Sequence, residues 1–206
     1  MKHSSHGDTQ AARLLSLAAG RELLPLSMIR REGLPSNVAS RLVREGKLER
    51  VGRGLYRHPD TPISAHHDFV EVMARTDKAV IVLLSALRFH ELGTQQPHEV
   101  WIQLPARARV PKIEWPALRV VRTRSEAHFT EGVERHFIGG TEIPVTNPAR
   151  TVADCFKYRN QIGLDVCLEA AKELRRRDRG SSHDLYHYAK LNRVQRVVQL
   201  YLEASA

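Results

Sequence analysis

The residues from Gly33 to Pro59, GLPSNVASRLVREGKLERVGRGLYRHP, constrain the fold more than any other stretch of the chain. On a helix from Ser36 to Glu45, stepped at about 100° per residue, apolar and polar side chains fall on opposite arcs. The apolar arc contains Val38, Ala39, Leu42 and Val43. The polar arc, which has Glu45 only at its border, contains Ser36, Asn37, Ser40, Arg41 and Arg44. Arg and Asn carry donor groups that match guanine and adenine edges in the major groove, so this arc suits DNA.

A hairpin is predicted directly after this helix. Gly46 suits the left-handed residue that ends a helix, and Gly52-Arg53-Gly54 is a tight turn between two alternating segments. Leu48 and Tyr56 are expected to pack inward. The basic residues of the segment are expected to point outward and to contact the DNA backbone or the minor groove; they are Lys47, Arg50, Arg53 and Arg57.

The residues upstream complete a winged helix-turn-helix. Leu26 to Arg31 predicts a short helix, Gly33 to Pro35 a turn, and Thr9 to Ala19 the remaining helix of the bundle. Two helices joined by a Gly-containing turn and followed by a basic hairpin are typical of this DNA-binding motif. The alternative is a small helical bundle with a solvated basic face.

Charge and composition agree with a DNA-binding protein. The 206 residues carry a formal net charge of +9, and residues 1–60 hold 11 basic against 6 acidic groups. The longest apolar stretch, Ala79 to Leu84, is far shorter than the ~20 residues of a membrane span, and no signal peptide is evident. We therefore expect a cytoplasmic protein, with Cys155 and Cys167 as reduced core residues.

The rest of the chain predicts a second, α+β domain. His58 to Pro62 interrupts the pattern, so the predicted domains are residues 1–60 and 61–206. Helices are predicted at Asp68–Thr76, Ala79–Leu92, Pro148–Tyr158, Leu164–Arg177 and Ser182–Ala204. Strands are predicted at Val100–Leu104, Leu118–Arg122, Val133–Ile138 and Ile143–Val145. The strands are grouped between helical segments, which favours a small mixed sheet followed by long C-terminal helices.

Two segments of this second domain resemble a known family. LLSALRFHELGTQQPHEVWIQLP (83–105) and NPARTVADCFKYRNQIGLDVCLEAAKE (147–173) resemble the AbiEi antitoxins of type IV toxin–antitoxin systems, as does the basic segment ending in Gly52-Arg53-Gly54-Leu55-Tyr56. The resemblance implies a bacterial antitoxin whose N-terminal domain binds duplex DNA at its own promoter, usually at inverted repeats, and represses the operon. It also implies a nucleotidyltransferase-like toxin as partner.

No motif in the chain predicts an enzyme. Gly180-Ser181 is not followed by the Asp-x-Asp pattern that a nucleotidyltransferase uses to hold metal ions, and no phosphate-binding loop occurs. The sequence therefore predicts no catalytic residue, no cofactor and no metal site.

Four charged residues of the second domain are candidates for neutralising the toxin: Arg150, Asp154, Lys157 and Arg159. Arg150 and Asp154 are spaced i, i+4, so the simpler interpretation is an intrahelical ion pair worth a few tenths of a kcal/mol. The other interpretation is a polar constellation that engages or modifies the toxin. The resemblance leaves a kinase-like antitoxin open, and a repressor without any toxin is a further alternative.

Overall fold

The computed structural model describes residues 4–178, 180 and 182–203. It is a mixed helix and strand structure, as the sequence predicts, and it forms two compact units. Unit 1 contains residues 4–77 together with Pro111–Ile113 and Phe137–Ile143. Unit 2 contains Lys78–Val110, Glu114–His136 and the described residues from Pro144 onward.

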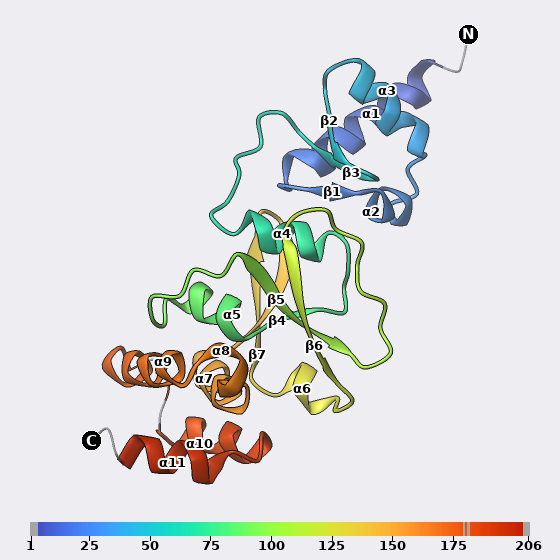
Figure 1. The fold of residues 1–206 in the computed structure, drawn as a ribbon. Helices are drawn as coiled ribbons and strands as arrows, with labels where there is room; N and C mark the ends of the chain where they lie inside the picture. The colour runs from blue at the N-terminus through green and yellow to red at the C-terminus, as the bar shows by residue number, and fades with distance from the viewer. Residues whose placement is uncertain (1–3, 179, 181, 204–206) are drawn as a thin grey trace. The chain divides into compact units, whose positions relative to one another are not determined.

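Three helices form the first part of unit 1 (Figure 1): α1 (Ser4–Ala19), α2 (Leu26–Arg31) and α3 (Ser36–Arg44). Their apolar faces share one core, to which Leu14, Ile29 and Leu42 contribute fully buried side chains. The predicted α2 and α3 are confirmed, whereas α1 begins five residues before the predicted Thr9. Gly46 ends α3 as predicted, with φ of 70° and the Lys47 amide donating to the Leu42 carbonyl at 2.9 Å.

A three-stranded antiparallel sheet follows, made of β1 (Leu24–Pro25), β2 (Glu49–Gly52) and β3 (Leu55–Arg57) in the order β1-β3-β2. The β2–β3 hairpin is the predicted one, and its Leu48 and Tyr56 are buried as expected. Strand β1 was not predicted, because two residues are too short to show alternation. The element order α1-β1-α2-α3-β2-β3 agrees with the predicted winged helix-turn-helix, and we call the β2–β3 hairpin the wing.

Helix α4 (His67–Met73) also belongs to unit 1, although the predicted domain boundary lies at residue 60. Two contacts explain the difference. His67 pairs with Glu22, whose side chain is fully buried, and Arg75 donates to the Arg53 carbonyl of the wing turn at 3.2 Å. The segment after the Pro-containing link therefore packs on the winged helix instead of starting the second unit.

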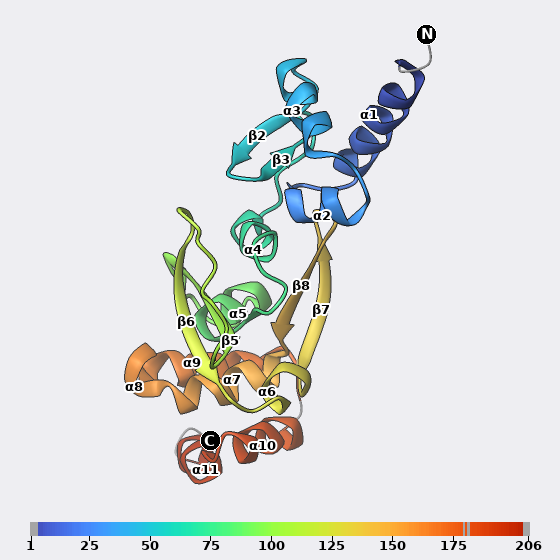
Figure 2. The same ribbon diagram turned by 90° about the vertical axis from the view of Figure 1, so that its right-hand side faces the viewer.

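Five strands form the second sheet, in the order β6-β5-β4-β8-β7 (Figure 2). They are β4 (Val80–Ile81), β5 (Glu99–Pro105), β6 (Ala117–Thr123), β7 (Val133–Ile138) and β8 (Thr141–Thr146). Strand β5 runs parallel to β6 and antiparallel to β4, and β4 runs parallel to β8. The four predicted strands are confirmed, each at nearly its predicted position.

The central strand β4 corrects the helix predicted over Ala79–Leu92. Only Leu83–His90 is helical, as α5, while Val80 and Ile81 are buried in the middle of the sheet. A short apolar run that is buried on both faces has no period to distinguish strand from helix, so the pattern was ambiguous there.

Helices complete the core of unit 2 together with this sheet: α6 (Ala127–Thr130), α7 (Pro148–Lys157), α8 (Arg159–Ile162), α9 (Leu164–Arg176), α10 (Ser182–Leu191) and α11 (Gln195–Glu203). Figures 1 and 2 show the α7–α9 layer between the sheet and the α10–α11 pair. The single helix predicted over Ser182–Ala204 is wrong, because the chain turns at Arg193 with φ of 59°; residue 204 lies outside the described residues. Cys155 and Cys167 are free thiols in the core, as predicted.

Candidate nucleic-acid interface and a buried arginine network

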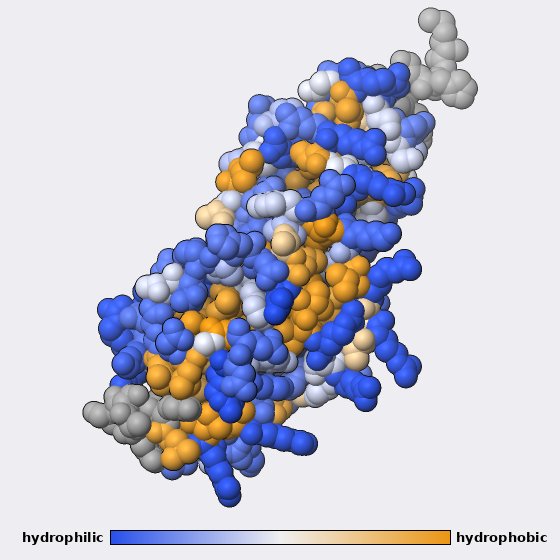
Figure 3. Space-filling view, in the orientation of Figure 1, coloured by the Kyte–Doolittle hydropathy of each residue, from blue (hydrophilic) through white to orange (hydrophobic). Residues whose placement is uncertain are grey.

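The polar face of α3 is exposed as the sequence predicts. Val38, Ala39 and Leu42 are buried, whereas the residues of the opposite arc are open to solvent, fully or in part: Ser36, Asn37, Ser40, Arg41 and Arg44. Gly33 at φ of 71° and Pro35 fix the turn from which the helix starts. In Figure 3, hydrophilic residues cover most of the visible surface over α2, α3 and the wing. The arrangement offers guanidinium and amide donors on one helix face.

Glu45, which was predicted only to border this face, forms ion pairs with two of the basic residues near it. Its carboxylate lies 2.9 Å from the Lys47 ammonium and 3.7 Å from the Arg41 guanidinium. The hydrogen bond from Lys47, followed by the nearby arginines, lowers the pKa of Glu45. Because all three groups are substantially exposed, the pairs contribute little to stability. They hold Arg41 and Lys47 near the C-terminal end of α3.

The wing arginines differ in how freely they face solvent. Arg53 is exposed at the turn, and Arg50 is exposed with its Nε 3.4 Å from the Gly52 carbonyl. Arg57, in contrast, donates to the Glu49 carboxylate at 2.5 Å and its side chain is only 21% exposed. Arg57 thus lies on the outer face of the hairpin with Glu49, opposite the buried Tyr56, but its guanidinium is occupied by the Glu49 carboxylate. Glu49 and Arg57 are direct cross-strand partners, and opposite charges at that spacing pair with one another.

The structure adds exposed residues on α2 that the sequence argument did not single out. Ser27, Arg30 and Arg31 lie on its solvent side, while Ile29 faces the core. In helix-turn-helix proteins the first helix of the motif crosses the DNA backbone, so these residues have the chemistry for phosphate contacts. In the sequence, the pair Arg30 and Arg31 at the end of the predicted helix could have indicated these phosphate contacts.

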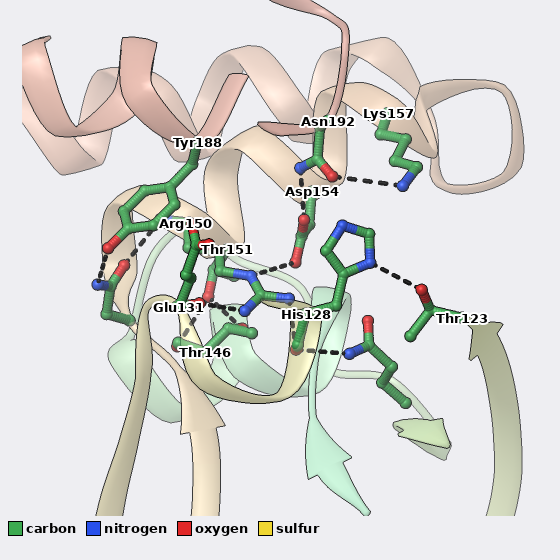
Figure 4. A network of polar contacts seen from close by, with 12 residues as sticks. Thr123, His128, Glu131, Thr146, Arg150, Thr151, Asp154, Lys157, Tyr188 and Asn192 are labelled. Carbon is green, nitrogen blue, oxygen red and sulfur yellow. Dashed lines mark hydrogen bonds and ion pairs between the residues drawn. The ribbon is translucent and has the colours of Figure 1, made fainter. Parts of the chain in front are cut away.

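The four candidates in the second unit divide into a buried pair and two peripheral residues. Arg150 is 1% exposed, and Figure 4 shows its guanidinium enclosed between the segment 128–131 and α7. It donates to the His128 carbonyl at 2.8 Å and to the Glu131 carbonyl, and its Nε lies 3.5 Å from Asp154. The intrahelical ion pair expected from the i, i+4 spacing is therefore present, but it is buried and joined to backbone carbonyls, so it is not the solvated pair worth a few tenths of a kcal/mol.

Further polar contacts extend this group, which we call the Arg150 network (Figure 4). Asp154 accepts from the Asn192 amide at 2.5 Å, and the Asn192 oxygen accepts from Lys157 at 3.3 Å. Asn147 caps α7 by accepting from the Arg150 amide and donates to the Tyr188 hydroxyl at 3.0 Å. These contacts fasten the α6–β7 segment and α10 to α7. Arg159 lies outside the network and donates to the Phe156 carbonyl.

His128 lies at the edge of the network. Its Nδ1 is 2.9 Å from the Thr123 hydroxyl, whose oxygen also accepts from the Ser125 amide at 3.2 Å. Partial burial, followed by the nearby Lys157 and Arg150 charges, lowers the pKa of His128. A neutral imidazole beside a hydroxyl is able to exchange a proton with it. The same contacts also close the turn at the end of β6, which is a structural role.

Comparisons with known proteins agree with the N-terminal architecture. Residues 12–59 match the family model described as "Transcriptional regulator, AbiEi antitoxin". The predicted resemblance to AbiEi antitoxins is thus confirmed over α1 to the wing, whereas the segments 83–105 and 147–173 lie outside the matched range. No curated protein matches the chain. No helix among the described residues is long and apolar enough to cross a membrane.

A solved structure shares the fold. The crystal structure of the RV2827C protein from Mycobacterium tuberculosis aligns with a TM-score of 0.57 at 17% sequence identity. The alignment covers 88% of this chain and 71% of the other. At this identity the similarity concerns the fold alone.

Proposed function

We propose that this protein is an antitoxin of a type IV toxin–antitoxin system that binds its own promoter through unit 1 and represses it. The observation that carries the proposal is the exposed face of α3 followed by an arginine-bearing wing, within the residues that match the AbiEi regulator model. The other interpretation of residues 1–60, a small helical bundle with a solvated basic face, does not account for the three-stranded sheet of β1, β3 and β2.

In this proposal α3 lies in the major groove. Arg41, Arg44 and Asn37 contact base edges, and Ser36 and Ser40 reach bases or phosphates. The wing contacts the backbone or the minor groove through Arg50 and Arg53, while Arg57 contributes less because Glu49 holds it. Backbone contacts supply affinity and base contacts supply specificity, so the two elements have separable roles.

A footprint of the full-length protein on the DNA upstream of its own gene tests this function. We expect one protected region, which in such systems is usually an inverted repeat. The affinity of the protein for this region is expected to fall as the salt concentration rises. Neutralising about five phosphates would give a log–log salt slope of roughly −4 to −5. Arg176→Ala, which removes a charge of α9 that pairs with Glu173, is the matched control and leaves the footprint unchanged. The absence of a protected region, or binding that ignores salt, contradicts the proposal.

We propose further that unit 2 neutralises a nucleotidyltransferase-like toxin without catalysis, in the bacterial cytoplasm. Because Arg150 and Asp154 are buried, we assign this pair a structural role. Lys157 and Arg159 are the more accessible of the four candidates. The Arg150 network then maintains the surface that α7 and α10 present.

Expression of the antitoxin from a foreign promoter, in cells that carry the neighbouring toxin gene, tests neutralisation. The antitoxin carries Arg41→Ala and Arg44→Ala, so that repression is removed while unit 2 stays intact. Protection of the cells supports the proposal, and loss of protection in Lys157→Ala or Arg159→Ala maps the contact. If protection needs α3, neutralisation is transcriptional and the proposal fails. ATP-dependent phosphate on the toxin supports a kinase instead, and the lack of any toxin gene nearby supports a stand-alone repressor.

A further inference from the structure

We infer that Arg75, which Glu71 holds in place, is a positioning residue that sets the wing for DNA binding. Arg75 follows α4 and lies outside the residues 12–59 that match the family model. The inference rests on the proposed function, because the wing has this role only if unit 1 binds DNA. It assigns part of the DNA-binding architecture to the segment after the Pro-containing link.

The contacts of Arg75 converge on the wing turn. Its Nη1 donates to the Arg53 carbonyl at 3.2 Å, and its Nη2 lies 2.9 Å from the place where a Cβ on Gly52 would be. Glu71 accepts from the Nε and Nη2 of Arg75 at 3.2 and 2.9 Å. The Glu71 side chain is largely buried, so the guanidinium is held from one side by a fixed carboxylate and reaches the turn with its other edge.

The turn is held from a second direction by the start of α2. The Leu26 amide donates to the Gly54 carbonyl at 2.8 Å. The wing therefore has two anchors on consecutive carbonyls, one from Arg75 to Arg53 and one from the Leu26 amide to Gly54. Strand β3 is held by pairing with β1 and β2, whereas the turn lies beyond these pairs, so the two anchors decide where the tip of the wing lies. The direction in which the Arg53 side chain leaves the turn follows from them.

The base of α4 is itself fixed to the winged helix. His67 at its start pairs with the buried Glu22, which follows α1 and whose amide donates to the Gly139 carbonyl at 2.8 Å. Arg75 thus extends from an anchored helix. Its planar fork serves Glu71 and the turn at the same time, which the single ammonium of a Lys matches poorly.

A double-mutant cycle in the full-length protein tests the inference. Arg75→Ala is expected to lower affinity for the upstream DNA and for random duplex alike, by about tenfold, the size of one charge-assisted hydrogen bond. Arg53→Ala lowers affinity through the lost phosphate contact. The two losses are expected to be non-additive, because Arg75 acts through the position of the wing. Arg75→Lys keeps the charge and is expected to recover only part of the affinity, while Arg176→Ala is the charge-matched control in unit 2.

Hydrogen exchange in the free protein provides a readout that does not involve DNA. Loss of the Arg75 anchor is expected to speed exchange of the Leu26 amide, with little change in the amides of α3. Unchanged Leu26 exchange in both Arg75 variants overturns the inference. Additive losses in the cycle also overturn it, since Arg75 would then contact DNA itself. If the wild-type protein binds no duplex, the proposed function fails, and the exchange rates alone decide whether Arg75 holds the turn.

Discussion

The arginines of α3 and the wing differ from Arg150 of α7 in what their guanidinium groups contact. Arg44 and Arg53 are exposed, and the backbone of Arg53, not its side chain, is what Arg75 holds. Arg150 is buried and directs its donors to two backbone carbonyls and Asp154. An exposed guanidinium keeps its donors for a ligand such as a phosphate or a base edge, whereas a buried one supports the fold. Residue type alone does not separate the two roles. What separates them is whether the guanidinium donors are already bonded to groups inside the protein.

The largest expected effect comes from removing the buried member of this comparison. Arg150→Ala removes the cation beside the buried Asp154 carboxylate, which keeps, among the described residues, only its bond from Asn192, and leaves two carbonyls without this donor. We expect the free energy of unfolding to fall by about 3–5 kcal/mol. Urea denaturation of the full-length protein measures it. Arg44→Ala is the matched control and is expected to change stability by roughly 0.5 kcal/mol or less.

A second variant keeps this prediction informative. Replacing Arg150 with Met and Asp154 with Leu removes both charges, so part of the stability is expected to return. A loss below about 1 kcal/mol for Arg150→Ala would mean that the network is dispensable for the fold, which contradicts the supporting role inferred from its burial.

The next effect sharpens the comparison within unit 1. Arg41→Ala and Arg44→Ala are expected to weaken binding to the upstream DNA more than binding to random duplex, by about 1–3 kcal/mol of discrimination. Arg53→Ala is expected to weaken both equally, since a wing contact to phosphate carries no sequence information. Competition gel shifts with the two duplexes measure the difference. Equal losses for all three variants would show that α3 does not contact bases.

A smaller effect is expected from the backbone of the wing. Gly54 has φ of 66°, so Gly54→Ala forces a side chain into the left-handed region at a cost of about 1 kcal/mol. The added Cβ would lie 3.5 Å from the Leu26 Cβ, an ordinary contact, so the strain comes from φ and not from a clash. DNA affinity and melting temperature should both fall modestly. Gly20→Ala, where nothing lies within 4 Å of the added Cβ, is the control and should change neither.

The sequence predicted best where the determinants are local. The α3 amphipathic pattern, Gly46 and the Gly52–Gly54 turn act within a few residues of one another, and each is confirmed. Arg150 shows the opposite case. Its i, i+4 partner is visible in the sequence, but the carbonyls of residues 128 and 131 reach it only through the tertiary fold.

The corrected elements have the same origin. Val80 and Ile81 become a central strand because β5 and β8 flank them, although the run AVIVLL is equally compatible with a helix. The turn at Arg193 places Asn192 against Asp154. These residues are 38 positions apart, so no local sequence pattern predicts their contact. Likewise, residues 61–77 join unit 1 through Arg75 and His67, whose partners lie in or beside the winged helix.

The smallest expected effect concerns the pH dependence of the Arg150 network. Burial, with Lys157 and Arg150 nearby, lowers the pKa of His128 from its ordinary value of 6.5, while Asp154 and Glu131 oppose the shift. The folded protein therefore binds a proton at His128 less readily than the unfolded chain does. By linkage, the contribution of this group to stability is present above pH 6.5 and is lost as the pH falls toward the lower folded-state pKa.

His128→Asn isolates this contribution, because an amide in place of Nδ1 can still bond the Thr123 hydroxyl but does not titrate. Melting temperatures of both proteins at pH 7.5, 6.5 and 5.5, values set about the ordinary His pKa of roughly 6.5, measure it. The melting temperature of the wild type minus that of the variant is expected to decrease as the pH falls, because only the wild type has the titrating His128. Carboxylates and the other histidines titrate in both proteins and cancel in the difference. A constant difference would show that His128 is as readily protonated in the folded protein as in the unfolded chain, and a difference that grows toward pH 5.5 would show that it is more readily protonated there.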